Sequence, residues 1–116
     1  MKIIYSDKIL DRVGLFKRIG GITLYPFIIL REHYKNRVSN IVNHESIHIS
    51  QQLELLVIPF YILYILEWFI KLFFYGKRAY YNISFEREAY ANEANKDYLQ
   101  TRKPYIWLKY IFKNRL

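Results

Sequence analysis

A long apolar stretch in the middle of the chain restricts its fold more than any other feature. Residues 53–75 are almost wholly apolar, with Pro59 near the start and Glu67 and Lys71 near the end. Proline breaks or kinks a helix, or opens a new one in its first turn. Glu67 and Lys71 stand four residues apart, so they can pair on one stripe of the helix that we predict over 55–75. The uninterrupted apolar piece before Glu67 is shorter than the roughly 20 residues that a membrane span needs.

Two interpretations of this helix stay open: it is buried or embedded in a surface, or it spans a membrane. The chain has 116 residues, which favours a single domain over 1–116 with one modest core. A core of that size does not surround such a helix on all sides. A lipid surface, or a second copy of the chain in a homodimer through this helix, would cover the remainder. Hydrophobic residues make up 53% of the chain, more than a small globule needs.

The charge of the chain bears on its partners. The formal net charge is +8, and the basic residues gather towards both ends. Such a balance favours anionic partners, either nucleic acid or acidic lipid headgroups. The sequence contains no RNA-recognition signature, zinc finger or helix-turn-helix pattern, so we do not expect nucleic acid to be a partner. Because the charge accompanies a long apolar stretch, a membrane surface fits better.

The first residues and the lack of cysteine bear on where the protein works. Residues 1–7 mix acidic and basic side chains before any long apolar region, so we expect no signal peptide. The chain has no cysteine, which excludes a disulfide framework and a cysteine-based zinc site. We therefore expect a cytoplasmic protein, or one that is peripheral or integral to the inner face of a membrane.

A second feature, just before the apolar stretch, has the spacing of a metal site. The segment reads His44-Glu45-Ser46-Ile47-His48 and uses two of the three histidines of the chain. Residues four apart on an α-helix lie on the same face, so His44 and His48 would direct two imidazole nitrogens at one zinc ion. Glu45 lies one step round the helix, where its carboxylate can reach a water on the metal. A catalytic zinc has three protein ligands, so another element must supply the third.

The patterns around this motif predict a mainly α (α+β) fold of three to four helices, with one short edge strand or small sheet near 22–30. Residues 22–30 are rich in β-branched and aromatic side chains. Pro26 restricts this strand to an edge, where a peptide could pair with it. Ser39 or Asn40 is a suitable N-cap for the motif helix. Residues 1–21 predict a short helix or an irregular arm.

Three further segments follow the apolar helix. Gly76 ends that helix, and residues 77–82 resemble a polar, tyrosine-rich loop. A helix over 85–99 follows, with acids in its first turn as the helix dipole prefers. Pro104 opens a last amphipathic helix. In this arrangement the apolar helix 55–75 lies between the two helices that would carry metal ligands.

The third ligand has candidates on two elements. One is His33, the remaining histidine, in the connector before the motif helix. The others are the acids of the helix after Asn82, which is rich in acidic and small residues. Glu86, Tyr90 and Glu93 fall on one stripe of that helix, at i, i+4 and i+7. The small residues between them would let two helix backbones approach closely.

The two segments together resemble the gluzincin group of zinc metallopeptidases, in particular its membrane-bound heat-shock and CAAX-type members and the very short minigluzincins. In those families one helix bears His-Glu-x-x-His, and a second bears Glu-x-x-Ala-Asp or Glu-x-x-x-Asp, whose Glu is the third ligand. The resemblance covers about residues 39–99 and implies a zincin-like core. It implies that His44, His48 and Glu86 are the zinc ligands and that Glu45 is the general base.

The chain departs from the family pattern at one position. Tyr90 stands where the family often has an aspartate that orients a histidine. Glu93, Asp97 or a backbone carbonyl must then take that role. An alternative register makes Glu88 the third ligand, but we prefer Glu86 because only Glu86 has alanine three residues later.

Two functions stay open at this point. The first is a zinc-dependent metallopeptidase, which hydrolyses a peptide or protein substrate with zinc-activated water and Glu45 as general base. His33, Tyr80, Tyr81 and Tyr90 are its candidate donors to the oxyanion. The second is a non-catalytic, membrane-associated helical module in which zinc ties two helices together.

Overall fold

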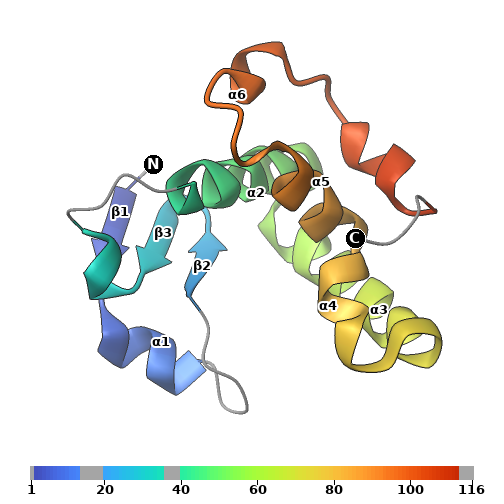
Figure 1. The fold of residues 1–116 in the computed structure, drawn as a ribbon, viewed down its shortest axis with the longest axis horizontal. Coiled ribbons are helices and arrows are strands. Elements are labelled where there is room, and N and C mark those ends of the chain that lie inside the picture. Colours follow the sequence, from blue (N-terminus) through green and yellow to red (C-terminus); the bar gives the residue numbers. More distant parts are fainter. Residues whose placement is uncertain (1, 14–19, 36–39, 113–116) are drawn as a thin grey trace.

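The computed structural model describes residues 2–13, 20–35 and 40–112, and it consists of helices with a small sheet at one side (Figure 1). The sheet and α1 (Asp7–Val13) come from the N-terminal part of the chain, and helices make up most of the remainder. The mainly α (α+β) fold class predicted from the sequence is confirmed. The short helix predicted near the N-terminus is α1.

The sheet has three short strands. They are β1 (Lys2–Tyr5), β2 (Gly21–Leu24) and β3 (Phe27–Leu30), in the order β1-β3-β2. β3 pairs parallel with β1 and antiparallel with β2, where Ile28 is the partner of Thr23. The single strand predicted over 22–30 is therefore a hairpin, because Tyr25 and Pro26 form a turn. Proline has a fixed φ and no amide hydrogen, which suits a turn better than a ladder.

The histidine motif lies on α2 (Ile41–Leu55), which contacts β2, β3, α3 and α5. The helix begins after Asn40, one of the two predicted N-caps, although the Asn40 side chain makes no capping hydrogen bond. Ser39, the other predicted cap, lies outside the described residues. Most of the middle of α2 is buried, including the whole motif.

The apolar stretch forms α3 (Val57–Tyr75), a separate helix that begins directly after Leu56. Leu56 has φ 66, which turns the chain sharply between α2 and α3. Pro59 lies in the first turn of α3, where its missing amide costs no helical hydrogen bond. Gly76 ends the helix with φ 56, as predicted. By length and composition α3 could cross a membrane, a property that core helices of soluble proteins can share.

The chain stays helical after α3, where a loop was predicted over 77–82. The elements are η2 (Gly76–Arg78), α4 (Ala79–Asn82) and α5 (Ser84–Asn92). α4 packs beside α3 (Figure 1). The loop prediction is wrong because the Asn82 side chain donates to the Arg78 carbonyl (2.8 Å) and satisfies the backbone of this extra turn.

The second ligand helix, predicted over 85–99, ends early at Asn92. The Asn95 side chain accepts a hydrogen bond from the Asp97 amide (3.0 Å), a local turn that competes with the helix. The last elements are α6 (Tyr98–Thr101) and the short 3-10 helix η3 (Ile106–Tyr110). In the described part of the chain, η3 takes the place of the amphipathic helix predicted from Pro104.

Two apolar clusters hold these elements together. The first joins α3, α5 and η3 and consists of Phe60, Ile83, Phe85 and Trp107. The second joins the sheet to α2 and consists of Ile28, Leu30 and Ile49. Because α2 contacts both β2 and α5, its inner face is held between the sheet and the second ligand helix.

Candidate metal centre

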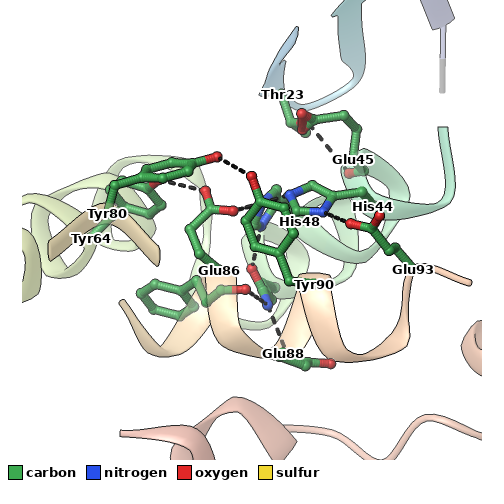
Figure 2. A network of polar contacts seen from close by, with 12 residues as sticks. Thr23, His44, Glu45, His48, Tyr64, Tyr80, Glu86, Glu88, Tyr90 and Glu93 are labelled. Atoms are coloured by element: carbon green, nitrogen blue, oxygen red, sulfur yellow. Dashed lines mark hydrogen bonds and ion pairs between the residues drawn. The ribbon is translucent and has the colours of Figure 1, made fainter. Parts of the chain in front are cut away.

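The three predicted ligands meet between α2 and α5 (Figure 2). Glu86 Oε1 lies 3.0 Å from His44 Nε2 and 3.2 Å from His48 Nε2. All three side chains are buried, and their ligand atoms lie within 4.8 Å of one another. α2 supplies two donors one turn apart, and α5 supplies the third by packing across α2. The structure thus brings together His44, His48 and Glu86, which were predicted as ligands although they lie on two separate helices.

The donor set fits a zinc ion. Zinc–nitrogen and zinc–oxygen bonds of 2.0–2.2 Å at tetrahedral angles place neighbouring donors roughly 3.3 Å apart. The two separations from Glu86 Oε1, 3.0 and 3.2 Å, are close to that value. Two imidazoles and one carboxylate are also the ligand types that a catalytic zinc combines with an open fourth position. His44, His48 and Glu86 could therefore hold the metal with little rearrangement.

A carboxylate orients His44 from behind. His44 Nδ1 lies 2.7 Å from Glu93 Oε1, which directs Nε2 towards the cluster. Asn43 holds the segment after α5 by donating to the carbonyls of Glu93 (2.8 Å) and Asn95 (3.0 Å). Glu93 is one of the residues predicted to replace the missing family aspartate. The Tyr90 ring, which stands at that family position, packs edge-on against the His44 ring instead, at 4.4 Å between centroids.

An amide orients His48. His48 Nδ1 lies 2.7 Å from Gln51 Oε1, and Gln51 Nε2 donates to Glu88 Oε1 (2.9 Å) and to the Phe85 carbonyl (3.1 Å). Gln51 is a residue of the site that was not predicted from the sequence. The available signal was its position three residues after His48, on the same face of the helix.

Glu88, the alternative third ligand, is not brought to the histidines. Its carboxylate is fully buried and accepts from Arg102 Nη2 (3.0 Å), Tyr98 Oη (2.8 Å) and Gln51 Nε2. Arg102 also donates to Glu54 Oε2 (2.8 Å) and Oε1 (3.1 Å) at the end of α2. Glu88 is therefore part of an ion network that ties the chain after α5 back to α2.

Glu45, the predicted base, lies beside the cluster at the sheet. Its Oε2 accepts a hydrogen bond from Thr23 Oγ1 (2.6 Å), so β2 holds the carboxylate (Figure 2). Gly21 permits this close approach of β2 and α2. A Cβ at Gly21 would lie 3.3 Å from Glu45 Oε1 and 2.7 Å from Leu30 Cδ2, which is too close.

Tyrosine hydroxyls surround the open side of the cluster. Tyr64 Oη donates to Glu86 Oε2 (2.5 Å), and Tyr80 Oη lies 3.3 Å from Tyr90 Oη. Tyr80 and Tyr90 were among the predicted oxyanion donors, whereas Tyr64 was missed because it lies within the apolar stretch. His33 is exposed on η1 (Glu32–Tyr34) and does not line the groove described below, so it is neither a third ligand nor a donor there.

The charges of the cluster stabilise one another. Burial is the largest effect and would lower the pKa of both histidines, but the hydrogen bonds and charge of Glu86 offset it. The pKa of His48 rises to about 9, and that of His44 is also raised. Burial would raise the pKa of Glu86, yet the charge of His48 and the hydrogen bonds from both histidines lower it well below its usual range. The cluster therefore favours positive charge next to the Glu86 carboxylate.

A groove of about 920 Å³ passes over the cluster. Its walls come from β2 on one side and from α3, α4 and α5 on the other. Many of the side chains along it are aromatic, among them Tyr61, Tyr64, Trp68, Tyr80, Tyr81 and Tyr90. The three ligand residues and Glu45 all line it, so a molecule in the groove would reach them.

Part of the β2 edge is already bonded within the chain. Gln52 Oε1 accepts from the Tyr25 amide (2.7 Å), and Gln52 Nε2 donates to the Thr23 carbonyl (2.8 Å). Tyr61 Oη donates to the same carbonyl. A peptide that pairs with this edge strand would therefore have to do so nearer to Gly21 and Ile22, both of which line the groove.

Comparisons with protein-family models, with curated proteins and with solved structures find no match to this chain. The interpretation of the site therefore depends on its residues and their geometry.

Proposed function

We propose that the protein is a zinc-dependent metallopeptidase in which His44, His48 and Glu86 hold the metal. The observation that carries the proposal is the position of Glu45. Its carboxylate lines the same groove as the three donors but is held by Thr23 rather than by the histidines. A bound zinc would activate water and polarise the scissile carbonyl. Glu45 would accept a proton from that water and pass it to the leaving amine.

The groove would hold the peptide or protein substrate. Its aromatic walls suit apolar side chains, and its open shape admits an extended chain. Tyr80 and Tyr90 have hydroxyls close to each other beside the cluster, where one of them could donate to the oxyanion. Burial raises the pKa of Tyr90 to about 12, so at neutral pH its hydroxyl keeps the proton that it would donate.

A second function remains open, a non-catalytic module in which zinc ties α2 to α5. The observation in its favour is that every ligand side chain is also anchored within the protein, His44 by Glu93, His48 by Gln51 and Glu86 by Tyr64. Such a metal would contribute to folding rather than to chemistry.

Replacement of Glu45 by glutamine separates the two functions. Glu45→Gln should lower peptide hydrolysis by about 100- to 10,000-fold, because the general base is lost. Zinc content should stay near one equivalent, because Glu45 is not a ligand. Glu32→Gln, on exposed η1, is the matched control and should leave hydrolysis unchanged.

Two outcomes decide against the peptidase. One is hydrolysis that survives Glu45→Gln, and the other is a zinc-loaded native protein that cleaves no peptide. Zinc content below about half an equivalent at neutral pH would contradict both functions.

We also place the protein at the cytoplasmic, inner face of a membrane, on the grounds of α3 and of the net charge of +8.

A further inference from the structure

α3 has most of its large aliphatic and phenylalanine side chains outside and both of its charged residues inside. Within this helix, all of which the structure describes, Phe60 and Lys71 are the buried residues. The outer face is exposed and consists of Ile58, Ile62, Leu63, Ile65, Leu66, Phe69, Ile70, Phe73 and Phe74. Phe73 is 78% exposed, Phe74 77% and Ile58 73%. A helix on the surface of a soluble protein has the opposite orientation, with its apolar stripe towards the core.

The two charged residues of α3 point into the protein and are fully used there. Glu67 accepts from the backbone amide and the hydroxyl of Ser84 (both 2.6 Å), at the start of α5. Lys71 pairs with Glu67 (2.9 Å) and donates to the carbonyls of Asn82 and Ile111. The pair predicted from the sequence is thus confirmed, and it holds α3 to α5. Neither charge is available to solvate the outer face.

We propose that the outer face of α3 rests on the surface of an anionic lipid bilayer, with the helix axis parallel to the membrane plane. The proposal deepens the membrane location given above and does not depend on zinc or on catalysis. An apolar helix face inserts into the boundary between headgroups and acyl chains, and nearby cations bind the anionic headgroups. Lys77 and Arg78 provide such cations directly after α3, and both are exposed.

The packing of α3 favours the plane of the membrane over a span. With 19 residues, α3 is about 28 Å long, close to the roughly 30 Å of a bilayer core. Its length is therefore compatible both with a span and with an in-plane position. α2, α4 and η2 all contact it, and the face away from the buried Phe60 and Lys71 stays exposed. In a span these elements would enter the hydrocarbon together with exposed polar residues such as Arg78. The transfer of such polar groups out of water has a high cost in free energy.

Charge favours lipid over a second copy of the chain. Each copy carries a net charge of +8, so two copies face to face on α3 would repel each other, whereas an anionic surface would attract each copy.

The in-plane orientation of α3 also has a consequence for the groove. Tyr61, Tyr64 and Trp68 line the groove from the inner side of the same helix, so the groove would open close to the membrane surface.

Vesicle binding with matched substitutions tests the contact. Ile65 is 60% exposed on the outer face of α3, and Ile9 is 40% exposed on α1. We expect Ile65→Glu to weaken sedimentation with vesicles of phosphatidylglycerol and phosphatidylcholine by at least about 10-fold, and Ile9→Glu to change it little. Binding should also be weaker to pure phosphatidylcholine and at high salt. Circular dichroism melting should show that both variants fold.

Cysteine labelling distinguishes an in-plane helix from a span. The chain contains no cysteine, so Leu53→Cys and Lys77→Cys place single thiols near the two ends of α3. An in-plane helix predicts that a membrane-impermeant maleimide reaches both thiols equally before and after the vesicles are lysed. A thiol that reacts only after lysis would demonstrate a span and overturn the proposal.

Two further outcomes would also overturn the proposed contact between α3 and the membrane. One is vesicle binding that Ile65→Glu leaves unchanged, and the other is a stable dimer through α3 that binds no vesicles. Repeating the sedimentation with Glu45→Gln and with metal-free protein separates this proposal from the proposed function. Loss of hydrolysis or of zinc with intact vesicle binding would bear on the proposed peptidase function alone and would leave the proposed membrane contact standing.

Discussion

The junction of α2 and α5 and the outer face of α3 depart from the pattern of a soluble protein in opposite directions. The junction buries histidines, glutamates and an arginine in the interior, where charge is costly unless it is paired. The outer face of α3 exposes large apolar side chains, which are costly in water. The first region pairs its histidines and glutamates by hydrogen bonds within the chain, whereas the second has apolar groups that the described chain leaves exposed.

This difference indicates what each region needs from outside. The side chains of the junction are anchored within the chain, and a cation between its three donors would complete it. The α3 face is open and continuous, so a large apolar surface would complete it. A small chain can therefore carry a charged interior and an apolar exterior together, provided that a metal and a membrane supply what its own core does not.

The largest expected effect compares two phenylalanines of α3. Phe60 is 2% exposed and Phe73 is 78% exposed. Phe60→Ala should lower the free energy of unfolding by about 3–5 kcal/mol, because it opens a cavity in the first apolar cluster. Phe73→Ala should change it by less than about 0.5 kcal/mol in lipid-free buffer. Urea denaturation measures both, and equal losses would show that the outer face is covered by protein.

The second prediction removes a buried charge at the junction. Arg102→Met leaves Glu88 and Glu54 without their cation, which should cost about 3–5 kcal/mol in the free energy of unfolding. Lys103→Met, at the exposed neighbouring position, is the control and should change stability by less than about 0.5 kcal/mol. Denaturation of both variants gives the comparison. A stable Arg102→Met variant would mean that the buried carboxylates find other partners.

The third prediction concerns the acid behind His44. Glu93→Ala should weaken zinc binding by about 10- to 100-fold, because His44 loses the group that orients its ring. Asp97→Ala removes the other acid that was predicted for this role and should leave zinc affinity unchanged. Competition with a chromophoric chelator measures both affinities. The assignment of Glu93 fails if the two variants behave alike.

The smallest effect is on the pH dependence of stability. The folded state raises the pKa of His48 from its ordinary 6.5 to about 9, so it favours the protonated form. The resulting stability is complete below about pH 6.5 and is lost as the pH rises towards 9. Glu86 has a lowered pKa, so its contribution is complete above its ordinary 4.5 and is lost as the pH falls further.

The metal-free protein should therefore melt on the order of 5 °C lower at pH 9 than at pH 6. Zinc should reverse this slope, because the metal binds only deprotonated histidines. Thermal melts with a chelator and with zinc show both slopes, and His33→Gln, which alters the exposed histidine, should preserve them. Parallel slopes in the two series would contradict the metal assignment.

The sequence predicted local features well and turns poorly. It predicted the facing histidines, the pairing of Glu67 with Lys71 and the end of α3 at Gly76, because each depends on spacing within one helix. It missed the turn at Tyr25 and Pro26 and the extra helical turns after Gly76. Those depend on single hydrogen bonds and on packing against distant elements, such as Asn82 with the Arg78 carbonyl.

By itself, the sequence determined that one helix carries two histidines on one face and that another is apolar on nearly every side. Only the tertiary structure decided which acid completes the cluster and where the apolar face points. Glu86 and Glu88 are two residues apart on a helix and so face different ways, and the packing of α5 against α2 brings Glu86 to the histidines. Likewise, Glu67 and Lys71 are held at α5, which turns the rest of α3 outward. Both outcomes depend on contacts between segments far apart in the chain, which spacing within one helix does not encode.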